Sequence, residues 1–180
     1  MKKKLFFLSA MALTSLSLKA QNVFTAIESK DAPAVKFLLN KGNVDVNAKD
    51  ANGSTALINA VKTGQDRIVK LLLEKDANID IKDKTGNTAL MYACTCKHDE
   101  ELYYMVSHYP NLNVQDNHGA TALVKAATIG NAAAVKVLLA YGAKANIKDK
   151  NGKTALDYAK PINNVEATNL LSNPVMASQK

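Results

Sequence analysis

Two cysteines and one histidine in a short segment, Cys94-Thr95-Cys96-Lys97-His98, are the side chains of this sequence best suited to chemistry. Thiolates and imidazole bind soft metal ions, so a metal site or a redox-active thiol is one hypothesis for the segment. Two residues separated by two positions, however, point about 200° apart around a helix. A local disulfide is therefore disfavoured, and the C-x-C spacing alone is weak evidence for a metal site.

Motifs of common enzyme classes are absent from the rest of the chain. The sequence contains no G-x-S-x-G, no H-E-x-x-H and no glycine-rich phosphate-binding loop. Four aspartates recur at a fixed interval, but aspartate is a frequent turn former, so a structural role is favoured for them. They are Asp50, Asp83, Asp116 and Asp149. We expect a non-catalytic protein without a cofactor.

A 33-residue period organises most of the chain, and four copies of G-x-T-A-L-x-x-A share one register. The recurring positions are Gly53, Gly86, Gly119 and Gly152; Thr55, Thr88, Thr121 and Thr154; Leu57, Leu90, Leu123 and Leu156; and Ala60, Ala93, Ala126 and Ala159. A period of this length is typical of repeat proteins, in which each unit buries its apolar face against its neighbours.

Each unit predicts a turn followed by two helices. In the second unit, Asp50 and Gly53 favour a tight turn, and Thr55 is placed to cap the first helix through its hydroxyl. Leu57 and Ala60 lie on one face of that helix. Gly64 then ends the helix and lets the chain reverse direction.

The units differ in regularity. We divide the chain into units of about 21–49, 50–82, 83–115, 116–148 and 149–172, followed by a flexible tail, 173–180. The first unit lacks the G-x-T-A-L motif, as a terminal repeat often does. In the third, Tyr109-Pro110 stands where the fourth has Gly142, which predicts a different exit from the helix. Pro161 is expected to shorten the first helix of the fifth.

Residues 1–20 have the organisation of a signal peptide. A basic start, Met1 to Lys4, precedes an apolar stretch, Leu5 to Leu18, and a small residue, Ala20, after which cleavage is expected. The apolar stretch is too short for a membrane-spanning helix. The pattern is typical of bacterial export and predicts a periplasmic or secreted protein with no membrane insertion after cleavage.

The positive charge of the chain is concentrated in this N-terminal segment. Lys2, Lys3, Lys4 and Lys19 account for four of the 23 basic residues, so the formal charge falls from +7 to +3 without residues 1–20. The remaining chain contains a single arginine, Arg67. A protein with so small a basic excess is not expected to bind nucleic acid.

The pattern D-x-x-G-x-T-A-L-x-x-A…G…(I/V)V-x-x-L-L-x-x-G-A resembles the ankyrin repeat, and the resemblance covers roughly residues 22–172. It implies an all-α solenoid of about five stacked helix-turn-helix units linked by β-turn or hairpin loops. The family's usual T-P-L-H motif reads T-A-L-x here. The family's histidine, which bonds to the backbone around the turn, is therefore absent. The residues in its place are Ile58, Met91, Val124 and Asp157.

The resemblance also implies binding to another protein through the hairpin tips and the concave face of the first helices. The candidate contact residues are Asn52, Lys62, Lys84, Thr85, Asn87, Met91, Tyr92, Thr95, Asn117, His118, Lys125, Thr128, Lys150, Asn151 and Tyr158. Tyr92 and Tyr158 are the expected aromatic anchors. The lysines among these residues favour an acidic partner.

Several biological roles remain open for such a binder. It is expected to be an immunity or inhibitor protein that caps a toxin or hydrolase, a partner of stress-defence proteins of the envelope, or an effector. The alternative from another class is a metal-binding or thiol-redox protein that uses Cys94, Cys96 and His98. Against it, Cys94 takes the place of Val61 and Ala127 on a buried helix face. Cys96 lies nearer the inter-helix turn, where an intermolecular disulfide is its expected chemistry.

Overall fold

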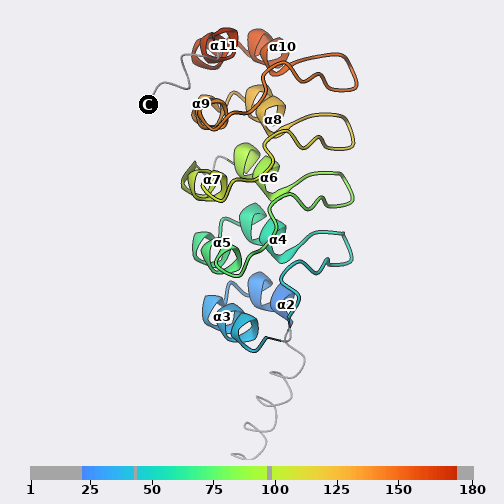
Figure 1. Cartoon of the computed structure of the whole chain (residues 1–180), viewed down its shortest axis with the longest axis vertical. Helices are drawn as coiled ribbons and strands as arrows, with labels where there is room; N and C mark the ends of the chain where they lie inside the picture. Colours follow the sequence, from blue (N-terminus) through green and yellow to red (C-terminus); the bar gives the residue numbers. More distant parts are fainter. Residues whose placement is uncertain (1–21, 43, 97–98, 174–180) are drawn as a thin grey trace, which may run out of the picture. The chain divides into compact units, whose positions relative to one another are not determined.

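The computed structural model describes residues 22–42, 44–96 and 99–173 (Figure 1). The chain forms two compact parts, one ending at Val44 and the other beginning at Asp45. The N-terminal part contains α2 (Val23–Glu28) and α3 (Ala32–Asn40), which pack against each other. Residues 1–20, predicted to be a signal peptide, and residues 174–180 of the predicted tail lie outside the described residues.

The C-terminal part consists of four helix pairs. The first helices of the pairs, called the inner helices, are α4 (Ala56–Lys62), α6 (Ala89–Cys96), α8 (Ala122–Thr128) and α10 (Ala155–Ala159). The second helices, called the outer helices, are α5 (Asp66–Leu73), α7 (Asp99–Val106), α9 (Ala132–Ala140) and α11 (Val165–Ser172). A short 3-10 helix, η1 (Lys160–Ile162), follows α10.

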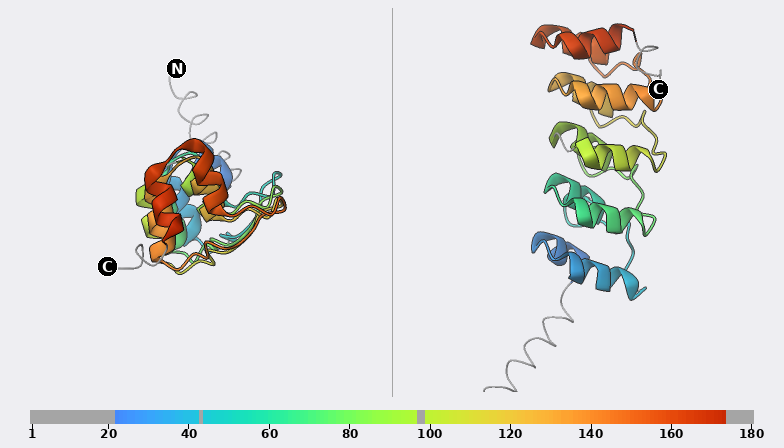
Figure 2. Two further views of the ribbon diagram at one scale, coloured as in Figure 1. Left: turned by 90° about the horizontal axis from the view of Figure 1, so that it is seen from above. Right: turned by 90° about the vertical axis from the view of Figure 1, so that its left-hand side faces the viewer.

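The helix pairs of this part stack in chain order. Each inner helix contacts the next inner helix, and each outer helix contacts the next outer helix. The inner helices lie between the outer helices and a row of hairpin loops, which all project to the same side (Figures 1 and 2). The described residues contain no strand, only an isolated bridge between Lys49 and Thr55. The arrangement is the repeat solenoid that the sequence predicts.

The inner helices begin at the predicted threonines. The hydroxyl oxygens of Thr55 and Thr121 each accept a hydrogen bond of 3.3 Å from the backbone N–H three residues later. Thr88 makes the corresponding bond at 3.4 Å. In the last repeat the direction differs, because the Thr154 hydroxyl and N–H both donate to the carboxylate of Asp157. Pro161 follows closely, and α10 is the shortest inner helix, as predicted.

Left-handed residues end the helices. Gly64 and Gly130 have φ angles of 62° and 69°, as expected for residues that terminate α4 and α8. The exit after α7 does not differ in backbone conformation, because Tyr109 has a φ of 54°, in the same left-handed region as Gly142. The difference lies in hydrogen bonding. The N–H of Ala143 bonds to the carbonyl of Leu138 at 2.9 Å, whereas Pro110 has no N–H for the equivalent bond.

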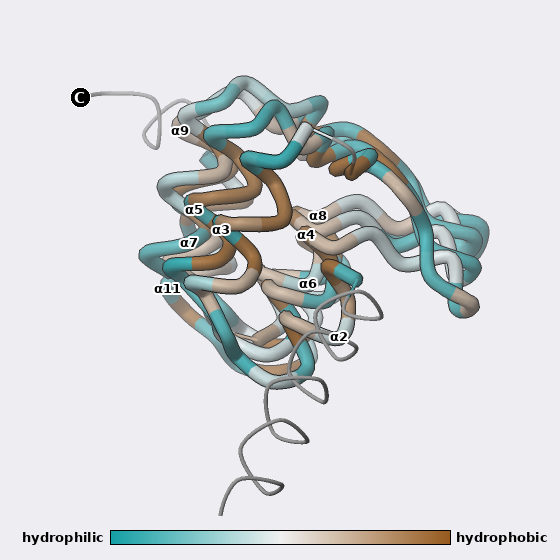
Figure 3. The backbone as a smooth tube through the Cα atoms, turned by 90° about the horizontal axis from the view of Figure 1, so that it is seen from below, coloured by the Kyte–Doolittle hydropathy of each residue, from teal (hydrophilic) through white to brown (hydrophobic). Residues whose placement is uncertain are grey.

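The core lies between the helices, and apolar stretches follow the helices while the hairpins are largely hydrophilic (Figure 3). The predicted core residues Leu57, Ala60 and Ala126 are fully buried. Cys94 is buried as well, as its alignment with Val61 and Ala127 predicts. Within the described ranges, no helix has the length and apolar character needed to cross a membrane.

A buried acidic side chain interrupts the apolar packing of α7. Glu101 of α7 is only 3% exposed, at the position that Ile68 and Ala134 occupy in the adjacent repeats. Neither of its carboxylate oxygens has a hydrogen-bond partner among the described residues. Burial raises the pKa of Glu101 to about 8, and the carboxylate of Asp66 on α5 acts in the same direction. A protonated Glu101 can donate to Asp66, which an ionised one cannot.

We predict that Glu101→Gln stabilises the protein at pH 8 and changes little at pH 5. The folded pKa of Glu101 lies above its ordinary value of 4.5, so wild-type stability is lost as pH rises from that value toward 8. Glutamine stays neutral and can donate to Asp66 at every pH. Urea unfolding should show the variant more stable by more than about 1 kcal/mol at pH 8. Equal differences at both pH values would contradict the prediction.

Candidate functional site

In the C-terminal part, each hairpin begins with an aspartate whose carboxylate accepts hydrogen bonds from backbone N–H groups later in the same hairpin. One oxygen of Asp50 accepts hydrogen bonds from the N–H groups of Asn52 and Ser54, at 2.8 and 2.9 Å. The N–H of Gly53 donates to the Asp50 carbonyl at 2.9 Å. Asp83, Asp116 and Asp149 make the same pair of carboxylate contacts in their own repeats. The turn-forming role predicted for the aspartates is confirmed.

The other oxygen of each aspartate reaches the inner helix, nine residues along the chain. The donors are Asn59 Nδ2 at 2.9 Å, Tyr92 Oη at 2.7 Å, Lys125 Nζ at 2.7 Å and Tyr158 Oη. This contact was not predicted from the sequence, although the residue nine positions after each aspartate has a hydrogen-bond donor in its side chain. This hydrogen bond attaches each hairpin to its inner helix. The donor residue directly follows the position at which ankyrin repeats usually have histidine.

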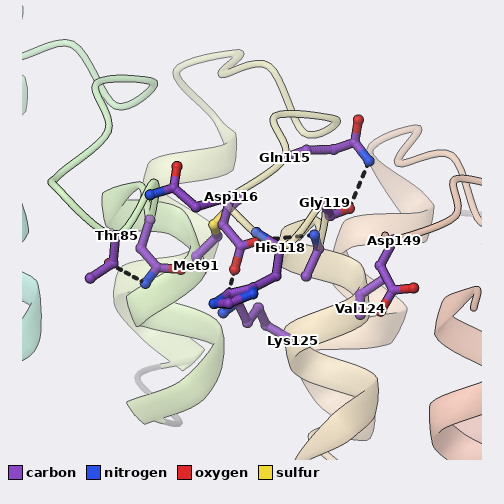
Figure 4. Close-up of polar contacts among 12 residues, drawn as sticks. Thr85, Met91, Gln115, Asp116, His118, Gly119, Val124, Lys125 and Asp149 are labelled. Carbon is purple, nitrogen blue, oxygen red and sulfur yellow. Dashed lines mark hydrogen bonds and ion pairs between the residues drawn. The ribbon is translucent and has the colours of Figure 1, made fainter. Parts of the chain in front are cut away.

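The contact is electrostatically strongest at Asp116, whose side chain is 1% exposed and whose partner Lys125 is 28% exposed (Figure 4). Burial raises the pKa of Asp116, but the bonds from Lys125 and from the N–H groups of Ala120 and His118 outweigh it and hold the pKa below its ordinary value. The pKa of Asp149 is also lowered, chiefly by the hydroxyl of Tyr158. These carboxylates are therefore ionised at neutral pH.

Neighbouring hairpins are also joined to one another. Lys84 Nζ donates to the carbonyl of Ala51 at 2.6 Å, and Asn117 Nδ2 donates to the carbonyl of Lys84 at 2.9 Å. The N–H of Lys150 bonds to the carbonyl of His118 at 2.9 Å. Gly119, with a φ of 80°, allows this approach, because a Cβ there would lie 2.9 Å from the nitrogen of Lys150. The tips thus form a fixed row rather than separate loops.

Most of the predicted contact residues are accessible on this row and on the inner helices. The exposed ones are Asn52, Lys62, Lys84, Thr85, Asn117, His118, Thr128, Lys150 and Asn151. Those of intermediate burial are Asn87, Tyr92, Thr95, Lys125 and Tyr158. We call these fourteen residues the inner face.

Met91 is the exception among the predicted contact residues. Its side chain is 2% exposed, and Ile58 and Val124 at the same repeat position are 0% and 3% exposed. The prediction that Met91 contacts a partner is therefore wrong. The position follows the buried leucine of the T-A-L motif, and it faces the neighbouring helices, where an apolar side chain fills the core.

The two expected aromatic anchors are held in place by their neighbours. The ammonium of Lys62 lies 4.9 Å from the centre of the Tyr92 ring, and that of Lys153 lies 5.5 Å from the Tyr158 ring. Such cation–π contacts add to the hydroxyl bonds with the aspartates. The rings are consequently fixed before any partner arrives, which lowers the entropic cost of using them in an interface.

The cysteine segment does not form a common site. Cys94 is fully buried and Cys96 is exposed, as their spacing predicts. Burial raises the pKa of the Cys94 thiol far above its ordinary value, with a further contribution from Asp99, so this thiol stays protonated. His98 lies outside the described residues. Among the residues that the structure describes, no three histidine, cysteine or acidic side chains are grouped to hold a metal ion.

Replacing Lys125 by methionine should destabilise the C-terminal part, because it leaves the buried carboxylate of Asp116 without its cation. We expect a loss of roughly 2 kcal/mol at pH 7, measured by urea unfolding. The depressed pKa of Asp116 provides stability above the ordinary value of 3.8, and this is lost as pH falls through the folded pKa. The loss should therefore shrink at acid pH. Lys136→Met, at an exposed site on α9, is the control. Equal effects of the two substitutions would contradict the prediction.

Comparisons with known proteins agree with this architecture. A family model described as ankyrin repeats (3 copies) matches residues 23–116, and a second, described as ankyrin repeats (many copies), matches residues 105–159. A search of curated proteins returned no match. Ankyrin repeats are protein–protein interaction modules and are generally non-catalytic. Because the first match alone spans more than half of the chain, this protein belongs to the ankyrin-repeat family.

Proposed function

We propose that the protein binds another protein of the bacterial envelope through the inner face. The observation that carries the proposal is a contrast within the hairpins. The residues that shape each hairpin recur, whereas the exposed residue two positions after the aspartate changes from Asn52 to Thr85, His118 and Asn151. A constant frame that presents variable exposed side chains is suited to recognition, because new contacts require no change of the backbone.

Charge favours an acidic partner. Among the described residues, the one ion pair joins Lys125 to Asp116. Lys84 Nζ bonds to a neutral carbonyl, and Lys62 Nζ lies over the Tyr92 ring, from where it acts on the Asp50 carboxylate without forming an ion pair. Their positive charge is therefore not neutralised by these contacts. A row of such charges attracts acidic surfaces and increases the rate of association.

Two roles fit a binder of this kind. One is an immunity or inhibitor protein that covers the active site of a toxin or hydrolase, and the other is a partner of stress-defence proteins in the envelope. Both require a preformed surface and no catalytic group in the binder itself. The identity of the bound partner distinguishes them.

Photo-cross-linking tests the inner face directly. Benzoyl-phenylalanine is placed at Asn52 or His118, which are exposed hairpin residues, or at Lys136 or Glu166, which are exposed on α9 and α11. In cells that produce the protein, the first two positions should capture the same partner, and the other two should not. Equal capture from all four positions would argue against the inner face.

Salt provides the test of the partner's charge. The cross-linking yield should fall several-fold when the salt concentration of an extract is raised from about 0.05 to about 0.5 M, because exposed charge pairs are screened. A yield that does not depend on salt would exclude an acidic partner while leaving the binding face itself in place.

We further propose that the protein acts in the periplasm or outside the cell, after removal of residues 1–20. The basic start and apolar stretch of this segment support export. N-terminal sequencing of the protein from a periplasmic extract or culture medium should begin at Gln21. Recovery from the cytosol with the segment still attached would contradict export.

A further inference from the structure

A hollow of about 350 Å³ lies at the C-terminal ends of α5 and α7, within the C-terminal part of the chain. Its lining residues come from two consecutive repeats and include acidic, aromatic and apolar side chains. They are Leu73, Asp76, Ala77, Asn78, Ile79, Asp80, His108, Tyr109 and Pro110. None of them belongs to the inner face.

Tyr109 is the largest exposed apolar surface at this hollow. The residue is 90% exposed, so its aromatic ring contributes little to the packing of the fold. Its backbone has a φ of 54°, a region that favours glycine, and Gly142 occupies this position in the next repeat. The fold therefore does not require a tyrosine here. Exposed aromatic side chains that packing does not explain are frequent contact residues in interfaces.

The negative charge of Asp80 is not required for the structural contact that its side chain makes. Its two oxygens accept hydrogen bonds from the N–H of Asn111 at 3.0 and 3.1 Å. The neighbouring repeats make the same junction with neutral side chains: the amide oxygen of Asn47 accepts from Asn78, and that of Asn113 accepts from Lys144, at 2.8 and 2.9 Å. An amide oxygen is thus sufficient for the structural contact.

The negative charge at the hollow also has no counter-ion in the described part of the chain. The ion pair between Lys125 and Asp116 is the one found there, so neither Asp80 nor Asp76 is paired with a cation. Asp76 is exposed and lies at the repeat position of Tyr109 and Gly142. Two unpaired carboxylates and an exposed aromatic ring therefore border one concave site.

We propose that this hollow binds an arginine side chain presented by a partner polypeptide, as a site separate from the inner face. A guanidinium group is planar, forms paired hydrogen bonds with a carboxylate and stacks on aromatic rings. The hollow offers both kinds of contact, with Asp76 and Asp80 as acceptors and Tyr109 as the ring. Pro110, which lines the hollow and is partly exposed, would contact the methylene groups of the arginine.

The test uses N-acetyl-arginine amide and its neutral isostere, N-acetyl-citrulline amide, added to the mature protein and followed by amide NMR shifts. The arginine probe should give saturable shifts at Asp76–Asp80, at His108 and Tyr109, and at Asn111. Citrulline should bind at least tenfold more weakly. Equal binding of the two probes, or shifts elsewhere only, would overturn the proposal.

Matched variants locate the charge and the ring. Asp80→Asn keeps the amide acceptor found in the adjacent repeats, and Tyr109→Gly restores the residue type of Gly142, so both should fold with an unfolding midpoint no lower than that of the wild type. Each should weaken the arginine probe at least fivefold. Glu74→Gln removes an exposed charge near the hollow but outside its lining and should change affinity less than twofold. An equal loss of affinity for the arginine probe in Glu74→Gln and Asp80→Asn would show that the probe responds to the net charge of the region, and would contradict a specific site.

Discussion

The C-terminal part of this protein depends on one carboxylate in each repeat. One oxygen of the aspartate bonds to two N–H groups of its own hairpin, and the other bonds to a donor nine residues later on the inner helix. The hairpin is thereby closed and attached to the helix by a single side chain. Hydrogen bonds to an ionised group are stronger than those between neutral groups. These bonds lower the pKa of Asp50, Asp83, Asp116 and Asp149 despite the burial that opposes them.

The same contact leaves freedom for recognition. The position nine residues after the aspartate must supply a hydrogen-bond donor, and asparagine, tyrosine and lysine all satisfy this requirement. The surface can therefore change from Asn59 to Tyr92 to Lys125 while the hairpin keeps its geometry. Beyond the hairpins, Asp80 and Tyr109 differ from the neighbouring repeats, where Asn113 makes the same backbone contact as Asp80 and Gly142 has the same left-handed conformation as Tyr109. Departures from the repeat pattern are thus more informative about binding than the shared residues are.

The sequence was sufficient to predict the repeats, the threonine caps and the left-handed glycines, because each of these depends on local chemistry repeated at a fixed period. Other features depend on contacts between repeats and could not be predicted in this way. Met91 is buried by its neighbours although its position aligns with a family histidine. Tyr109 has the left-handed φ of Gly142, a conformation that the residue type did not indicate because it is strained for a residue with a Cβ. The second bond of each aspartate was missed because the offset of nine connects a loop to a helix.

Amide hydrogen exchange tests the role of the carboxylates most directly. In the wild-type protein, the backbone N–H of Ala120, which bonds to Asp116 at 2.9 Å, should exchange as slowly as the amides of α8. In Asp116→Ala, this amide and that of His118 should lose their protection, while the amides of α8 and α9 keep theirs. A hairpin that exchanges like an unstructured chain in the wild type, or that stays protected in the variant, would show that the aspartates do not hold the hairpins in place.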